Sequence, residues 1–427
     1  ATGWPNPAGV VSARQRWPTE VGVSAGRGDG PQTREAREVV QRVRRGIAAM
    51  TGHDPDHVAL CSGATEGLNL VLRALLSNRR RVTTTSLEHS SVVRPLLALQ
   101  AQGEVSVYVV GQDHGDELST DSVCDALRTE PADVLIFTHA SNVTGGVFDA
   151  QQICDVARSK GIATVLDVSQ TVGYLPINVG ADIVVGSCHK AMHGPPGLGF
   201  VSTNSEVDLP PQKFGGTGSS VALAHHPTSW PQAFEAGTPN TLAIFGAAAA
   251  LDWLEEQGTA KLLQRSLAAL RTIEAGVDEI TSLRSLSPGT SVRTPVLSFV
   301  HEDYDPLEVS TILSANGIHT RAGFHCAPWA HQRLGTGAAG TVRISTGPHT
   351  TAADTEALLD ALLRRQAHRG HLGGREDHRR ARLQRLRVRA AARARRACRH
   401  AEPAVYACLG AHQARRRPAP HPHAPPP

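Results

Sequence analysis

The order of apolar and amphipathic segments predicts an α/β protein with a mostly parallel sheet, followed by a smaller α+β domain. Up to about residue 261, short runs rich in Val, Ile and Leu alternate with segments of helical periodicity, a pattern typical of βαβ units. Beyond that point the order of the segments changes. Polar residues also follow directly on several of the buried runs, where ligands bind such sheets. A chain of 427 residues, 40% of them hydrophobic, can bury a large core.

The elements follow in a regular order along the chain. The runs expected to form buried strands are 57–63, 81–86, 105–110, 132–141, 162–170 and 181–187. Helix-like segments lie between them at 65–76, 91–102, 119–129 and 149–160. After residue 262 we expect a helix, a strand at 294–300, a second helix, extended segments at 317–323 and 341–346, and a last helix at 351–363. The predicted domains are therefore a large one, 1–261, and a small one, 262–363.

The remaining segment, 364–427, has a different composition. It holds 17 arginines, no lysine and three acidic residues, a net charge of +14, so the total of +4 leaves −10 for residues 1–363. Few large apolar residues are present, and such a segment cannot offset its ordering entropy by burial. We expect a disordered tail. An arginine-rich arm for nucleic acid and an out-of-frame translation of a GC-rich gene are the other interpretations.

Targeting and cysteine patterns set the expected compartment. The chain has no run of ~18 apolar residues and no basic-then-apolar start, so we expect neither a membrane span nor secretion, and we expect a cytoplasmic location. Its seven cysteines are scattered, odd in number and without a CxxC pair. This argues against a disulfide framework and against a structural zinc site, and it predicts free thiols.

Three of the residues that follow strands have complementary chemistry. A helix that opens at Thr65, after the small residues of "SGAT", would point backbone N–H groups at an anion such as phosphate, although a plain helix cap would look the same. Asp167 ends a buried strand and needs a cationic partner or hydrogen bonds. Lys190 follows the next strand, where desolvation turns an amine into a nucleophile for a carbonyl. Together these groups suit pyridoxal 5′-phosphate.

Several motifs carry a resemblance to a known family. "SGATEGLN", "SLEHSS", "THASNVTG", "LDVSQTVG", "GSCHKAMHGPPGLG", "FEAGTPN" and "RAGFHCAP" resemble, in order, motifs of the class V, fold-type I pyridoxal-phosphate-dependent enzymes. The chain is most similar to the cysteine desulfurases, and the match runs from residue 1 to about 363. The opening "ATGWPNPAG" resembles the middle of the family's first motif, so we expect a truncated N-terminus. The resemblance implies a fold-type I homodimer that binds pyridoxal 5′-phosphate.

The resemblance also implies roles for individual residues. Lys190 would bind the cofactor aldehyde and move the substrate Cα proton, Asp167 would keep the pyridine nitrogen protonated, and His89 would stack on the ring. Without the family, His89 reads as a surface histidine. Further cofactor contacts are implied for Ala64, Thr65, Asn142, Gln170, Ser187, His189 and, from a second subunit, Thr238.

The predicted reaction depends on three further residues. Arg343 would pair with the substrate carboxylate, with Asn142 and Arg321 nearby; a salt bridge inside the small domain is the alternative for Arg343. In cysteine desulfurases a thiolate in the position of Cys326 attacks the sulfur of L-cysteine, becomes a persulfide and releases alanine. The short segment before Cys326 resembles the branch that passes sulfur to a dedicated acceptor protein. From composition alone, Cys326 would be an ordinary loop cysteine.

Other functions stay open at this stage. Within the same enzyme class the alternatives are a selenocysteine lyase, another C–S lyase and a class V aminotransferase. From a different class, the alternative is a nucleic-acid-binding protein that acts through the basic tail and carries a degenerate enzyme body.

Overall fold

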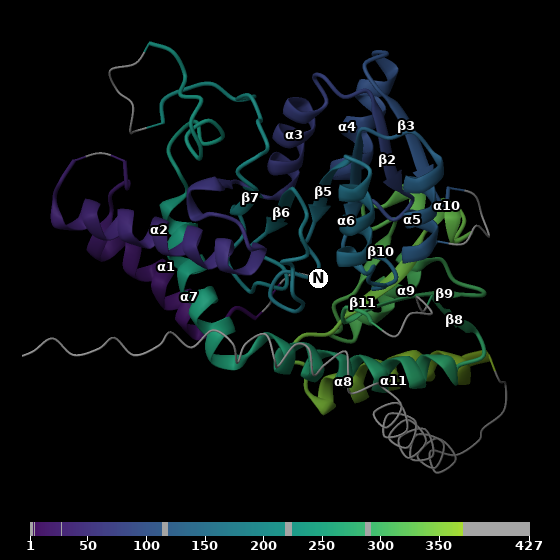
Figure 1. Ribbon diagram of the computed structural model, residues 1–427. Coiled ribbons are helices and arrows are strands. Elements are labelled where there is room, and N and C mark those ends of the chain that lie inside the picture. Colours follow the sequence, from purple (N-terminus) through teal and green to yellow (C-terminus); the bar gives the residue numbers. More distant parts are fainter. Residues whose placement is uncertain are drawn as a thin grey trace, which may run out of the picture.

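Figure 1 shows the computed structural model, which describes residues 3, 5–26, 28–112, 118–217, 224–286 and 292–369. The predicted tail lies outside the described residues from residue 370 onward.

A seven-stranded sheet forms the centre of the molecule. Its strands are β1 (Val58–Cys61), β2 (Arg81–Thr85), β3 (Ser106–Val110), β4 (Val134–Thr138), β5 (Ala163–Asp167), β6 (Ile183–Ser187) and β7 (Gly199–Thr203), in the order β1-β7-β6-β5-β4-β2-β3. The pairs from β3 to β6 are parallel, whereas β7 runs antiparallel to both of its neighbours. The six predicted strands and the mostly parallel sheet are confirmed. The strand β7 was not predicted, because its five residues follow a run of glycines and prolines that reads as a loop.

Helices cover both faces of this sheet. Side chains alternate along each strand, so Val165 and Val185 pack with α3 (Ala64–Leu75) and α4 (Ser90–Ala101), while Leu166 and Val184 face the opposite core. Helices of that second core are α2 (Pro31–Thr51), α5 (Thr120–Thr129), α6 (Ala150–Ser159) and α7 (Thr241–Gln257). The N-terminal helix α1 (Ala8–Arg16) packs on α7, followed by the π-helical turn η1 (Trp17–Val21); the 3-10 turn η2 (Pro55–His57) leads into β1.

The C-terminal part contains a second, antiparallel sheet. Its order is β10-β11-β9-β8, with strands β8 (Leu283–Ser285), β9 (Val296–His301), β10 (Arg321–Gly323) and β11 (Thr341–Ser345). Its helices are α8 (Thr259–Asp278), α9 (Pro306–Ala315), α10 (Pro328–Arg333) and α11 (Ala352–Arg369). The predicted extended segment 317–323 is a strand only over its last three residues, and the last helix continues six residues beyond 363. The position of the domain boundary, 261/262, stays a prediction.

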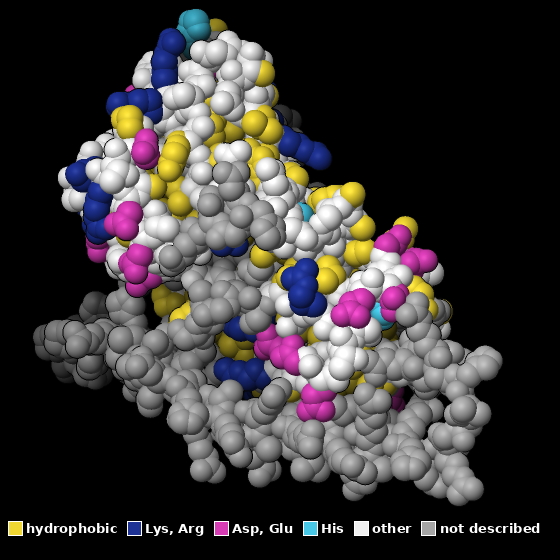
Figure 2. All heavy atoms as spheres, turned by 90° about the vertical axis from the view of Figure 1, so that its right-hand side faces the viewer, with side chains coloured by type: hydrophobic (Ala, Val, Ile, Leu, Met, Phe, Trp, Pro, Cys, Tyr) yellow, Lys and Arg dark blue, Asp and Glu magenta, His cyan; other side chains and the backbone are white. Residues whose placement is uncertain are grey.

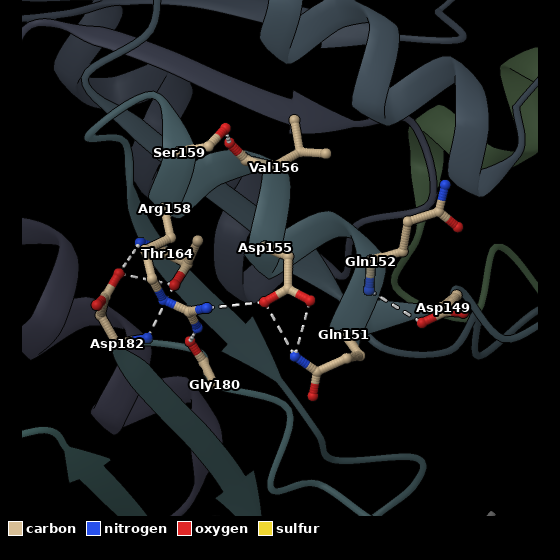
Figure 3. A network of polar contacts seen from close by, with 10 residues as sticks. All are labelled: Asp149, Gln151, Gln152, Asp155, Val156, Arg158, Ser159, Thr164, Gly180 and Asp182. Atoms are coloured by element: carbon tan, nitrogen blue, oxygen red, sulfur yellow. Dashed lines mark hydrogen bonds and ion pairs between the residues drawn. The ribbon is translucent and has the colours of Figure 1, made fainter.

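A polar network fixes the amino ends of β5 and β6 (Figure 3). The Asp182 carboxylate accepts hydrogen bonds from the Thr164 amide and hydroxyl, both at 2.8 Å, and from Asn204 Nδ2 at 2.9 Å. Arg158 donates to the Gly180 carbonyl at 2.7 Å and pairs with Asp155, also at 2.7 Å. Because these contacts join the two strands where they begin, they fix the register in which their carboxyl ends meet.

The face of the molecule in Figure 2 gives little support to the alternative of a nucleic-acid-binding protein. On the described part of that face, basic side chains are interspersed with acidic and apolar ones and do not form one continuous basic area. A basic surface for nucleic acid would need the clustered positive charge that the sequence places in the tail. In the described residues, no helix has both the length and the apolar character needed to cross a membrane.

Candidate active site

The predicted site residues gather where β4, β5 and β6 end. In the sheet register, Thr138 of β4 lies beside Asp167 of β5, and β6 follows on the other side. Asp167 is buried, and its Oδ1 accepts a hydrogen bond from the Ser169 amide at 2.8 Å. Parallel strands bring these residues to one edge because their carboxyl ends all meet there.

Lys190 lies in the turn after β6. Burial lowers the pKa of the Lys190 amine, while the Asp167 carboxylate acts in the opposite direction and the Arg343 guanidinium adds to the lowering. Desolvation disfavours the ammonium form. The amine is therefore closer to its nucleophilic, neutral form than the amine of a surface lysine.

An anion site lies at the start of α3. Gly63, the N-cap, has no side chain to bond the first helical amides, and a Cβ on it would meet nothing within 4 Å. Ala64 N donates to Ser187 Oγ at 3.0 Å, and the Thr65 and Ser91 hydroxyls lie 2.7 Å apart. Gly199 packs directly on Gly63: a Cβ added to Gly199 would lie 2.6 Å from the Gly63 backbone. Amides and hydroxyls gathered at a helix N-terminus suit a phosphate.

His89 is the N-cap of α4. Its Nδ1 accepts a hydrogen bond from the Ser91 amide at 3.1 Å and lies 2.8 Å from the Ser91 hydroxyl. Burial, with the positive charge of Lys190 next in importance, lowers the pKa of the His89 imidazole to about 4. The ring is therefore neutral at pH 7. This corrects the interpretation as a surface histidine that the sequence alone favours.

Cys326 comes to the site from the second sheet's side. It and His325 adopt left-handed backbone conformations, with φ of 60° and 50°. The Cys326 carbonyl accepts a hydrogen bond from Ser90 N at 2.6 Å, and the His325 carbonyl accepts one from Asn142 Nδ2 at 2.7 Å. These two bonds tie the loop to the residues that follow β4 and begin α4. Arg321 Nη2 lies 3.3 Å from the Cys326 sulfur as a donor.

Two arginines lie opposite each other on β10 and β11. Arg321 and Arg343 are register partners, an arrangement that like charges disfavour unless an anion lies between or beside them. Arg343 is buried and donates to the Asn142 carbonyl at 3.0 Å. Burial and the Arg321 charge lower the pKa of Arg343 to about 10. No carboxylate of the described residues forms an ion pair with it, so the salt-bridge alternative finds no support there.

Two further predicted residues differ in where they lie, and three others were missed. Gln170 borders a cavity of about 380 Å³ that Lys190 also lines, and Thr238 is exposed in the loop before α7. The missed residues are Glu88, Ser90 and Ser91: Ser91 bonds to His89 and Thr65, Ser90 bonds to the Cys326 loop, and Glu88 bonds to Thr85 and Thr138. All three lie in "SLEHSS", a motif in which only the histidine was singled out.

Comparisons with known proteins agree with this geometry. Residues 4–358 match the family model described as aminotransferase class-V. A probable cysteine desulfurase of Methanothermobacter thermautotrophicus is 29% identical over 84% of this chain and 91% of its own, and one of Streptomyces coelicolor is 30% identical over 83% and 88%. The apo structure of a cysteine desulfurase from Thermococcus onnurineus has a TM-score of 0.77 at 24% identity, covering 84% of this chain and 91% of its own. The fold is therefore that of the fold-type I enzymes, and the chain belongs to the aminotransferase class-V family.

Proposed function

We propose that the protein is a pyridoxal-phosphate-dependent cysteine desulfurase, which converts L-cysteine to L-alanine and holds the sulfur as a persulfide on Cys326. The observation that carries the proposal is the position of Cys326. Arg321 donates to its sulfur, its loop is hydrogen-bonded to Asn142 and to Ser90 beside His89, and it interacts electrostatically with Lys190. The names of the curated relatives support the same activity.

The residues of the site fit the proposed cofactor. The uncapped start of α3 suits its phosphate, Asp167 suits its ring nitrogen and the Lys190 amine suits its aldehyde. His189 adds a buried Nδ1 that has no partner among the described residues and can contact the phosphate. When bound, pyridoxal phosphate supplies an electron sink for charge that develops at the substrate Cα.

The chain's own residues handle the protons and the sulfur. The Lys190 amine accepts the Cα proton and later returns a proton to the carbon skeleton, a task for which a lowered pKa is suited. Arg343 and Asn142 hold the substrate carboxylate. The Cys326 thiolate attacks the substrate sulfur; an S–S bond forms, the C–S bond breaks, and its electron pair stays with the carbon skeleton that becomes alanine. No external oxidant or reductant is needed.

A homodimer and a sulfur acceptor belong to the same proposal. Thr238 is exposed, and its motif resembles one that reaches the phosphate of a second subunit in the family. Cys326 is half-buried, so a second protein with a nucleophilic thiol would have to approach this loop to take the sulfur.

Cys326→Ala tests the proposal directly. It should keep cofactor binding but lose roughly 10³-fold or more of its alanine-forming activity with L-cysteine, because a covalent nucleophile is gone. Wild-type protein given L-cysteine without reductant should gain ~32 Da on the Cys326 peptide, the mass of one sulfur atom. Cys154→Ala, a change at a buried position on α6, is the matched control and should keep the mass gain. A variant without Cys326 that turns over L-cysteine at the wild-type rate would replace this proposal with another C–S lyase or an aminotransferase.

A further inference from the structure

A second carboxyl group is buried beside the site and has no part in the reaction described above. Glu88 follows β2 by three residues, precedes His89 and is fully buried. Its Oε1 accepts hydrogen bonds from Thr85 Oγ1 at 2.6 Å and from the Thr138 amide at 3.0 Å. Its Oε2 is buried and has no hydrogen-bond partner among the described residues.

The Glu88 side chain supplies a hydrogen-bond acceptor where β4 has no further backbone partner on β2. The β2–β4 ladder ends at the pair Thr84 and Ile136, two residues before β4 ends. A buried backbone amide beyond that point needs an acceptor, and Glu88 Oε1 provides it for Thr138. The chain can therefore leave the sheet after Thr85 and turn, so that the next residue, His89, becomes the N-cap of α4 above the site.

The charges around Glu88 favour its neutral form. Burial, reinforced by the Asp167 carboxylate, raises the pKa of Glu88 to about 8. The nearby histidines bring no compensating positive charge near pH 7, because burial lowers the pKa of both His89 and His139 to about 4. Two buried carboxylates this close would repel each other, so one of them keeps its proton.

We propose that Glu88 is a positioning residue that acts as a neutral carboxylic acid: it joins β2 to β4, sets the position of His89, and adds no second negative charge beside Asp167. The part that concerns His89 rests on the proposed function, since His89 acts there on the bound cofactor. The part that concerns protonation belongs to the fold alone.

Protonation is tested on protein stripped of cofactor. The folded state keeps the Glu88 proton up to a pKa of about 8, whereas the unfolded chain loses it near 4.5, so this group's stabilisation is complete below pH 4.5 and is lost as the pH rises to about 8. Glu88→Gln copies the neutral acid. Between pH 5.5 and 8, wild type should lose about 2–6 °C more in Tm than Glu88→Gln does. Equal losses in the two proteins would overturn the assignment of a neutral acid.

Positioning is tested on the holoenzyme through the visible absorption band of bound pyridoxal phosphate. Glu88→Gln should match the wild-type band at pH 7 and keep it up to pH 9, whereas the wild-type band should shift as Glu88 ionises near pH 8. Glu88→Ala leaves the Thr138 amide without its acceptor and should shift the band throughout this range. Asp182→Asn is the matched control, because it alters a carboxylate that accepts a strand amide at the other end of the sheet, and it should leave the band unchanged.

The two arms separate this inference from the proposed function. The positioning role would be overturned if Glu88→Ala had the same absorption band as wild type at every pH, or if Glu88→Gln lost the band at pH 7. If wild type binds no pyridoxal phosphate, the proposed function fails, but the Tm comparison still decides whether Glu88 is neutral.

Discussion

The two ends of strands β5 and β6 differ in how completely their polar groups are satisfied. At the amino ends, the Asp182 carboxylate accepts two hydrogen bonds from Thr164 (Figure 3) and a third from Asn204, which follows β7. At the carboxyl ends, Lys190 is half-buried with a lowered pKa, a ring nitrogen of His189 has no partner among the described residues, and the N-cap of α3, Gly63, has no side chain to accept from the helix. The same two strands therefore carry a saturated network at one end and an unsatisfied one at the other.

This difference separates stability from chemistry. A satisfied network lowers the free energy of the folded state and leaves nothing free to bind a ligand. Unsatisfied buried groups cost free energy, and that cost is recovered when a ligand of complementary charge binds. Mutations at the amino ends should therefore change unfolding, and mutations at the carboxyl ends should change binding and turnover.

The largest effect is expected from Lys190→Ala. Turnover of L-cysteine should fall by about 10³-fold or more, because the amine that binds the cofactor and moves protons is gone. The Tm of the cofactor-free protein should not fall, since a buried amine is removed. Borohydride reduction followed by peptide mapping should place the pyridoxyl group on Lys190 in wild type. Lys160→Ala, on the exposed end of α6, should behave as wild type; a pyridoxyl group found on Lys160 would break the comparison.

Asp182→Ala should have the opposite profile. It removes the acceptor of three hydrogen bonds, two of them from Thr164, and should lower the free energy of unfolding by about 2–4 kcal/mol. The kcat and KM for L-cysteine at 25 °C should stay within about twofold of wild type, because the site is at the other end of the strands. A stable variant with impaired turnover would show that the two ends are coupled.

A smaller effect is expected from pH, through His139. This fully buried histidine follows β4, and burial lowers the pKa of its imidazole to about 4. The unfolded chain binds a proton at His139 near pH 6.5, so the group's contribution to stability is complete above that pH and is lost as the pH falls to about 4. Between pH 6.5 and 4, the free energy of unfolding measured in urea should fall by about 1–3 kcal/mol more in wild type than in His139→Asn. His225→Asn, at an exposed position, is the control. The prediction would be contradicted if the unfolding free energy of this variant depended on pH as weakly as that of His139→Asn.

Local patterns were sufficient to predict most of the fold. Short runs rich in β-branched and apolar residues predicted β1 to β6. The pattern is continuous in β4, β5 and β6, because strands buried on both faces have no polar alternation. The strand β7 was missed, because five residues after a Gly- and Pro-rich turn carry too little periodicity. Its place in the sheet depends on antiparallel pairing with β6, the preceding strand, and with β1, which is far away in the sequence.

For the site, the sequence by itself determined which chemical groups are available: an amine at Lys190, a carboxylate at Asp167 and a thiol at Cys326, each beside a strand or turn. Only the tertiary structure decided that the Cys326 loop bonds to Ser90 and Asn142, and that Glu88 closes the β2–β4 ladder. Both results follow from long-range hydrogen bonds and from burial, which shifts the pKa values of Lys190 and Glu88. Burial depends on which distant segments pack around a residue, and a single sequence pattern does not contain that information.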